Sequence, residues 1–335
     1  MAIAKSCMRK IDHYQSHQIS DLINENGLAI AEYALEKDFI VTQVLKVISQ
    51  LGNSNFDCVF CGGTCLSKAY KLLARISEDV DFKVVSKAAG VLGNSKRREL
   101  LGAFKRQVME CLVASGFPVE YIKVDKARNN NGYILLSIAY ESYFSPGFDM
   151  RAHVRVEFNY TQLSAPVATK KIGLLFDVLA AATVGQTFEV PCIDLMEAAV
   201  EKLVLFPRRL AMYQENPGRI FEPLMVRHLY DIHQIAAAYP ALFSPSDRLH
   251  SLMLNVIEKD AQLFSRQHPE FLGDPVGELY KAMESVQADM QMRQHYDRFI
   301  EVMVYGREPP TFDMACNAFQ RALVSAMPVP QNPAH

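Results

Sequence analysis

The chain has 335 residues, half of them apolar, and carries a formal net charge of −2 at neutral pH. This length and apolar content suffice for two domains with sizeable cores, and they exclude a fibrous or disordered chain. The small negative charge argues against a protein that coats nucleic acid through its global charge, so we expect no direct DNA binding.

A membrane segment and a disulfide framework are also not expected. The longest apolar run, Ile172–Val184, is too short to span a bilayer and contains Asp177, and the amino terminus has no apolar signal region. The seven cysteines are an odd number in a long chain. We therefore expect a cytoplasmic protein without a membrane partner. Three closely spaced cysteines have no second Cys or His pair at zinc-finger spacing and are expected to be small core residues: Cys58, Cys61 and Cys65.

A glycine turn follows the first predicted strand, Phe56–Phe60. Gly62 and Gly63 allow the backbone to turn sharply and to approach a ligand closely, because neither carries a Cβ atom. Thr64 is expected to cap a helix over about Cys65–Arg75, whose first amide groups would then face a phosphate.

Two aspartates open the next predicted strand, Val80–Val85. Asp79 and Asp81 alternate with Val80 and Phe82, so both carboxylates lie on one face while the apolar side chains enter the core. Hard oxygen ligands side by side suit Mg²⁺. A glycine turn alone or an Asp-x-Asp pair alone is commonplace, but their succession favours a site for a nucleoside triphosphate and its metal ion.

Three further strands are expected, over Val119–Val124, Tyr133–Ala139 and His153–Tyr160, with a turn at Asn129–Gly132. In the last strand the apolar side chains point one way and Glu157 points the other. Glu157 is either a third acidic residue beside the aspartates or a plain solvent-facing glutamate.

A basic cluster follows the paired aspartates. A helix is expected over about Ser95–Ser115, and a strand and loop come after it. A nucleic-acid contact and an ordinary solvated surface both remain open for this cluster. It comprises Lys96, Arg97, Arg98, Lys105 and Arg106 on the helix, and then Lys123, Lys126 and Arg128.

From about Asp194 the pattern becomes almost wholly helical, and we place the domain junction near residue 165. The expected domains are therefore residues 1–165 and 166–335, with a proline-rich tail that is disordered from about residue 328. On the first helix Lys202 and Arg209 share a face, with Pro207 bending the helix between them. They are either a pair that converges on a triphosphate or ordinary surface cations. The expected helices span Leu195–Tyr213, Ile220–Ala238, Ser246–Phe264, Val276–Met290 and later segments to about Met327.

The run GGTCLSKAYKLLARISEDVDF resembles the signature of the nucleotidyltransferase AbiEii/AbiGii toxin family, a branch of the polymerase-beta-like nucleotidyltransferases that includes the MenT toxins. Glu36–Leu45 resembles that family's N-terminal helix. Glu201–Val204 with Arg209, and then Arg227–Asp231, resemble its two later motifs, and the likeness spans about residues 30 to 240. One departure is His228, which stands where the family usually has an aspartate.

This resemblance implies an α/β fold, with a nucleotidyltransferase-type mixed sheet and flanking helices followed by a mainly helical C-terminal domain that completes the active-site cleft. It implies a Mg²⁺-dependent toxin, with Mn²⁺ as an alternative ion, that transfers NMP from an NTP to an acceptor hydroxyl. The acceptor implied is the tRNA 3′ end, so that translation is blocked, and the partner implied is a cognate antitoxin. The catalytic residues implied are Asp79, Asp81, Glu157, Lys202 and Asp231, of which the first three bind metal, and the nucleotide-binding residues are Gly62, Gly63, Thr64, Lys68 and Arg209.

Two other functions fit the same residues. The metal site also suits a phosphotransferase that acts on a protein hydroxyl, and a catalytically idle module could use its cleft to bind a partner. Intact Gly63, Asp79, Asp81 and Lys202 argue against the idle module.

Overall fold

The computed structural model describes residues 8–88, 90, 92–145, 150–181, 186–215, 218, 221–265 and 267–327. The chain forms two compact units, Met1–Ile193 and Asp194–His335. The proline-rich tail from residue 328 lies outside the described residues. Among the described helices, none combines the length and apolarity that a membrane span requires.

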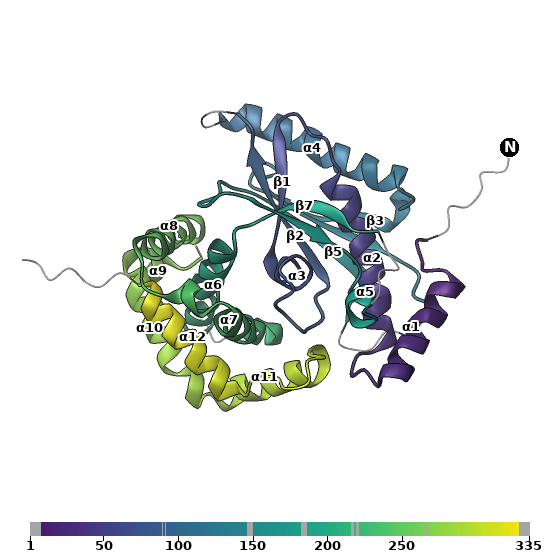
Figure 1. Ribbon diagram of the computed structural model, residues 1–335. Coiled ribbons are helices and arrows are strands. Elements are labelled where there is room, and N and C mark those ends of the chain that lie inside the picture. The colour runs from purple at the N-terminus through teal and green to yellow at the C-terminus, as the bar shows by residue number, and fades with distance from the viewer. Residues whose placement is uncertain are drawn as a thin grey trace, which may run out of the picture. The chain divides into compact units, whose positions relative to one another are not determined.

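A mixed sheet is the centre of the first unit (Figure 1). Its seven strands lie in the order β3-β4-β5-β2-β1-β7-β6. β2 lies between β1, to which it is antiparallel, and β5, to which it is parallel. The expected α/β fold with a mixed sheet is therefore confirmed. The strands are β1 (Phe56–Cys61), β2 (Asp79–Ser86), β3 (Ile122–Arg128), β4 (Tyr133–Ala139), β5 (His153–Tyr160), β6 (Ala168–Ile172) and β7 (Phe188–Cys192).

The two faces of the sheet differ in chemistry because side chains alternate along each strand. We call one the aromatic face, defined by Phe56, Phe60, Phe82 and Phe158. Along it the ring centroids of Phe60 and Phe82, and those of Phe82 and Phe158, lie 5.7 Å apart. We call the other the carboxylate face, defined by Asp79, Asp81 and Glu157.

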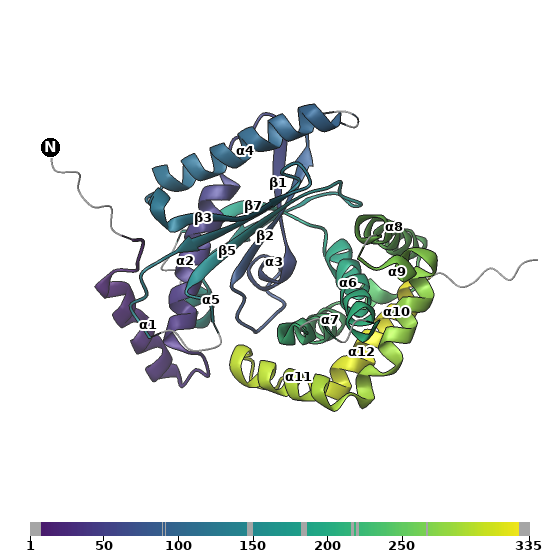
Figure 2. The same ribbon diagram turned by 180° about the vertical axis from the view of Figure 1, so that it is seen from behind.

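Helix α4 (Asn94–Ala114) lies along the aromatic face (Figure 1). The ring of Phe104 is 5.4 Å from that of Phe158 and 5.9 Å from that of Phe56. In the reverse view of Figure 2, α4 again lies along one side of the sheet, and α1 and α2 lie side by side. The other helical segments of this unit are α1 (His13–Asn26), α2 (Glu32–Ser49), α3 (Gly62–Lys68), η1 (Val119–Tyr121) and α5 (Leu175–Leu179).

The expected turn between β3 and β4 is present. Asn129, Asn130 and Asn131 have φ angles of 52°, 57° and 64°. Asparagine enters this left-handed region more readily than most side chains do, so three consecutive asparagines suit the reversal.

The second unit is helical in its described residues, as expected. The helix α6 (Leu195–Glu215) continues through Pro207, and the segment expected to be helical from Ile220 instead has a 3₁₀ turn before α7. The remaining elements are η2 (Pro223–Val226), α7 (Arg227–Ala238), η3 (Pro240–Phe243), α8 (Asp247–Phe264), α9 (Pro269–Gly273), α10 (Pro275–Glu284), η4 (Val286–Ala288), α11 (Met290–Met303) and α12 (Phe312–Ala326).

The division between the units follows Ile193 and not residue 165, the expected junction. The reason is the pair of short strands β6 and β7, because β7 pairs with β1 and carries β6 with it into the sheet. These strands belong with the mixed sheet and not with the helices.

Candidate active site

Three carboxylates lie together on the carboxylate face of the central strands. Asp81 of β2 is directly opposite Glu157 of β5, and Asp79 is two positions from Asp81 on the same strand. The alternating neighbours Val80 and Phe82 are fully buried on the aromatic face, as the sequence predicts. The sheet therefore holds three acidic side chains side by side on rigid strands.

The two positions after β1 require glycine, because a Cβ atom there would clash with a neighbouring side chain. Gly62 has φ of +74°, and a Cβ atom at this position would lie 2.1 Å from Oδ2 of Asp81. A Cβ atom on Gly63 would lie 2.4 Å from Nη2 of Arg75. The glycine pair thus makes room for a carboxylate of the candidate site and for a buried guanidinium.

The expected cap at Thr64 is wrong. Helix α3 begins at Gly62 and has Cys61 at its N-cap position without a side-chain capping bond, and it ends at Lys68 and not at Arg75. Buried Thr64 instead donates from Oγ1 to the backbone carbonyl of Asp79, and its Oγ1 lies 2.7 Å from Oγ of Ser77. Thr64 therefore fixes the start of β2 relative to the glycine turn.

A network of charged side chains, anchored on a buried ion pair, contacts Asp79. Nζ of Lys37 lies 2.6 Å from Oε2 of Glu78, and both side chains are almost wholly buried. Nη1 of Arg151 contacts Oε1 of Glu78 at 3.1 Å and Oδ1 of Asp79 at 2.8 Å. Arg151 thus links the buried Lys37–Glu78 pair to a carboxylate of the candidate site.

Glu157 has a partner on the neighbouring strand. The hydroxyl of Tyr133 donates to Oε2 of Glu157 at 2.8 Å. Burial raises the pKa of Glu157, and the charge of Asp79 raises it further. The Tyr133 hydrogen bond and the charge of Arg155 lower this pKa, but the net shift is upward. The crowding of negative charge is what a bound cation would relieve, and an all-oxygen donor set fits Mg²⁺ or Mn²⁺.

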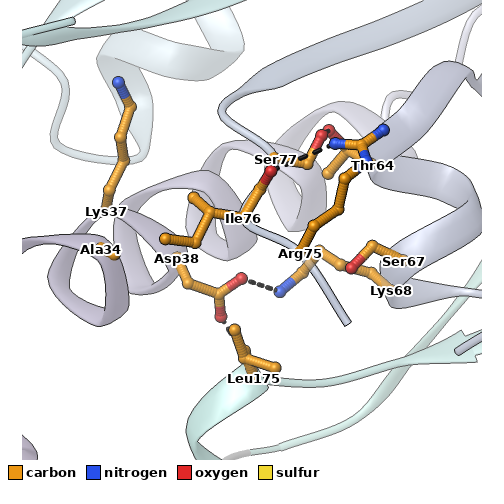
Figure 3. A pocket seen from close by; sticks show the side chains of 10 residues that line it. All are labelled: Ala34, Lys37, Asp38, Thr64, Ser67, Lys68, Arg75, Ile76, Ser77 and Leu175. Atoms are coloured by element: carbon orange, nitrogen blue, oxygen red, sulfur yellow. Dashed lines mark hydrogen bonds and ion pairs between the residues drawn. The ribbon is translucent and has the colours of Figure 1, made fainter. Parts of the chain in front are cut away.

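A small pocket lies beside the glycine turn. Its polar lining includes the hydroxyls of Thr64, Ser67 and Ser77 and the cations Lys68 and Arg75 (Figure 3). Lys68 forms an ion pair with Oδ1 of Asp38 at 2.5 Å, as the dashed line in Figure 3 shows. In this arrangement the Lys68 ammonium joins α3 to α2.

The second unit holds its own buried charge group, on α6 and α7. Nζ of Lys202 lies 2.9 Å from Oδ2 of Asp231, which is fully buried, and 3.5 Å from Nδ1 of His228. Burial and the Lys202 charge lower the pKa of His228 well below its usual value, so the ring is neutral and accepts from the ammonium at Nδ1. His228 thus presents a neutral acceptor to Lys202.

Arg209, on the same helix, is engaged elsewhere. Its Nη2 lies 2.5 Å from Oε2 of Glu222. That Arg209 and Lys202 converge on a triphosphate stays a prediction.

The basic residues divide between the two faces of the sheet. Lys105 and Arg106 belong to α4, which packs on the aromatic face. Lys126 of β3 pairs with Leu135 of β4, which is opposite Glu157, so Lys126 is on the carboxylate face. Its charge lowers the pKa of Glu157.

Sequence reasoning did not identify four supporting residues: Arg75, Glu78, Tyr133 and Arg151. Their partners lie on other elements, so no local spacing marks them. One signal was available in the sequence. Glu78 directly precedes Asp79, so three acidic residues lie within four positions, and Glu78 is the buried one among them.

Comparison with known proteins agrees with this geometry. The model of the nucleotidyl transferase AbiEii toxin family, of type IV toxin–antitoxin systems, matches residues 49–318. Among solved structures, MenT4, a nucleotidyltransferase toxin from Mycobacterium tuberculosis H37Rv, is similar with a TM-score of 0.54 and 19% identity, covering 91% of this chain and 89% of that chain. At that identity the likeness shows the fold. No curated protein matches the chain.

Proposed function

This chain belongs to the AbiEii toxin family, the nucleotidyltransferases of type IV toxin–antitoxin systems, and from that premise we propose that it transfers NMP from an NTP to the 3′ end of a tRNA. The acceptor hydroxyl oxygen would bond to the α-phosphorus while the bond to the bridging oxygen of the β-phosphate breaks, and pyrophosphate would leave. A tRNA blocked at its 3′ end cannot be aminoacylated, so cytoplasmic translation would stop.

The observation that carries this proposal is the register of β2 and β5. It places Asp81 opposite Glu157 and Asp79 on the same face, which fixes three carboxylates on rigid strands. Asp79, Asp81 and Glu157 would hold Mg²⁺ or Mn²⁺. When bound, such an ion neutralises charge on the triphosphate and lowers the pKa of the acceptor hydroxyl.

The chain's own residues would orient the reactants. Gly62 and Gly63 allow the backbone to approach the triphosphate, and Thr64 holds β2 against that turn. Tyr133 and Arg151 fix the rotamers of Glu157 and Asp79. Lys68 completes the proposed phosphate set, although binding there requires its ammonium to leave Asp38.

The helical unit would contribute positive charge. Lys202 and Arg209 would neutralise charge that develops on the triphosphate, and Asp231 would hold the Lys202 ammonium in place. The antitoxin of the system is the expected protein partner, and we propose that it is a separate protein that acts on this toxin.

The test is incubation of the full chain with each NTP, labelled at either the α- or the γ-phosphate, in the presence of total RNA and protein. Mass spectrometry should find one added NMP on tRNA with the wild type. Asp79→Asn and Asp81→Asn should lose the transfer with little change in melting temperature, because they remove repulsion between neighbouring carboxylates.

A matched control is Asp57→Asn, which changes an exposed aspartate on β1. It should keep full activity. Label from the γ-phosphate on a protein would instead establish a phosphotransferase, and full activity in both site variants would remove the carboxylate assignment.

A further inference from the structure

His268 is a buried histidine of the second unit whose ring makes no hydrogen bond within the described residues. Its side chain is almost wholly inaccessible, and neither Nδ1 nor Nε2 has a hydrogen-bond partner there. The ring stacks on Phe271 with centroids 5.6 Å apart. Burying an imidazole without satisfying it is unfavourable, so its surroundings call for an explanation.

The polar atoms that face this ring are carboxylate oxygens. Nε2 of His268 lies 3.2 Å from Oε2 of Glu215 and 3.8 Å from Oε2 of Glu278. Ligand atoms of Glu215, His268 and Glu270 all lie within 4.8 Å of one another. Oε2 of Glu278 is itself buried without a hydrogen bond in the described residues. The groups are close together but not aligned as donors and acceptors.

We propose that Glu215, His268 and Glu270 form a binding site for one divalent transition-metal ion, with Zn²⁺ as the best match. Zinc binds imidazole nitrogen and carboxylate oxygen at about 2.0–2.2 Å, and sites with three protein ligands keep a fourth position for water. Tetrahedral ligands at such distances are separated by about 3.3 Å. The observed separation of 3.2 Å between Glu215 and His268 matches that value.

The donor set also selects the class of ion. Mg²⁺ and Ca²⁺ prefer six or more oxygen ligands, whereas imidazole favours zinc and its neighbours. The site is therefore chemically distinct from the all-oxygen carboxylate face of the first unit.

Charge balance points the same way. Three glutamates surround one imidazole. The charge of one of them, Glu278, is offset by Lys281, whose Nζ lies 3.3 Å from Oε1 of Glu278. A bound dication would offset the other two. Glu278, whose Oε2 lies 3.8 Å from Nε2, would remain beside the metal as an outer partner.

The consequence of binding is mechanical. Glu215 ends α6, and His268 and Glu270 lie at the start of α9. Between them, residues 216, 217, 219, 220 and 266 are outside the described residues. A metal ion would tie the end of α6, the helix that carries Lys202, to α9. We infer a stabilising role within the helical unit and not a role in the chemical step.

The test uses the full chain, stripped of metal with a chelator and titrated with Zn²⁺ by calorimetry in excess Mg²⁺, which occupies the all-oxygen site. Metal content after gel filtration and the melting temperature with and without Zn²⁺ are measured in parallel. The wild type should bind one Zn²⁺ and melt at a higher temperature when it is bound.

The variants are His268→Gln and Glu270→Gln, with His233→Gln as the matched control. His233 also has a buried ring nitrogen without a hydrogen bond in the described chain, but its charged neighbour is Arg321. Zn²⁺ affinity should fall at least about tenfold in the first two variants and should not change in the third. Glu270 is exposed, so its variant should fold.

Two results would overturn the proposal. One is a wild type that binds no Zn²⁺ in excess Mg²⁺. The other is retention of wild-type affinity and of the Zn²⁺-dependent rise in melting temperature by both His268→Gln and Glu270→Gln.

Discussion

Arg151 donates from Nη1 to Oδ1 of Asp79 across 2.8 Å. The same nitrogen contacts Oε1 of Glu78 at 3.1 Å, and the Arg151 backbone N–H donates to Oε2 of Glu78 at 3.0 Å. Because Glu78 is also paired with buried Lys37, the guanidinium is held at a fixed place. Asp79 is therefore oriented by a network that is anchored on the buried Lys37–Glu78 pair.

The first prediction concerns this orientation. Arg151→Ala should reduce NMP transfer about 10- to 100-fold and raise the Mg²⁺ concentration needed for half-maximal rate, because Asp79 loses the group that fixes its rotamer. Arg151→Lys should recover only part, since a single ammonium cannot reproduce the planar guanidinium. Mg²⁺ titrations of the rate check both, with exposed Arg98→Ala as control. An unchanged Mg²⁺ dependence in Arg151→Ala would contradict this role.

The second prediction concerns the glycine turn. Gly62→Ala should destabilise the fold by about 1–2 kcal/mol because of its positive φ, and should reduce transfer by about a hundredfold because the methyl group displaces Asp81. Gly52→Ala is the control, since a Cβ atom there meets nothing within 4 Å. Urea unfolding and initial rates are measured together. Equal activity in the two variants would show that Asp81 need not lie against the turn.

The third prediction is a pH dependence of stability. Burial alone would raise the pKa of Glu78, but the charges of Lys37 and Arg151 outweigh it and hold that pKa below its usual value. The stabilisation is therefore present above the unfolded-state pKa, near 4.5, and is lost as the pH falls through the lower folded-state pKa.

The measurement compares wild type with Lys37→Met/Glu78→Gln, which removes both partners so that neither charge is left buried alone. Urea unfolding between about pH 6 and pH 3 should show a free energy of unfolding that falls more steeply for the wild type. If the free energy of unfolding falls equally with pH in the wild type and the variant, Glu78 has the same pKa in the folded and the unfolded state.

How much of this architecture was predictable depends on the range of the interactions. The alternation of apolar and polar residues predicts β4 and β5 at their observed bounds, Tyr133–Ala139 and His153–Tyr160, and places Glu157 on the correct face. Local pattern fails for α3, whose helical sequence continues toward Arg75. Arg75 instead folds back so that its guanidinium lies against Gly63, a contact that no periodicity encodes.

The short strands β6 and β7 were missed for a related reason. β6 is the edge strand Ala168–Ile172, and its two lysines interrupt any apolar alternation. β7 is defined by its parallel pairing with β1, which is distant in sequence. Arg151 and Tyr133 likewise acquire their roles only once the sheet order brings β5 between β4 and β2.

The fourth prediction separates stability from activity at Lys202. Lys202→Ala should destabilise the helical unit by about 3–5 kcal/mol, because it leaves the buried Asp231 carboxylate without its cation. Lys202→Met/Asp231→Asn should regain much of that stability but not the transfer activity. Thermal melting and labelled-NTP transfer are the readouts.

The control for Lys202 is another ion pair of the same unit, between buried Arg208 and half-buried Asp260. Arg208 lies 2.5 Å from Asp260 and packs on the ring of Phe264. Arg208→Met/Asp260→Asn makes a comparable change and should keep its transfer rate. Wild-type kinetics in the Lys202→Met/Asp231→Asn variant would show that Lys202 has only a structural role.

The last prediction concerns where the proposed tRNA acceptor would bind. Lys126 is on the carboxylate face, close enough for its charge to lower the pKa of Glu157. Lys105 and Arg106 are on α4, which packs on the aromatic face. Lys126→Glu should therefore weaken tRNA binding and reduce the salt slope by about 1, because one phosphate contact and its released counterion are lost.

Lys105→Glu/Arg106→Glu is the matched charge reversal on the opposite face, and it should have the smaller effect on tRNA affinity. Titrations of tRNA at several salt concentrations measure both, with NTP binding as the internal control. A larger loss in the α4 variant would show that the acceptor RNA wraps onto the aromatic side of the sheet. Equal, unchanged affinities would place the RNA-binding surface outside both strand β3 and helix α4.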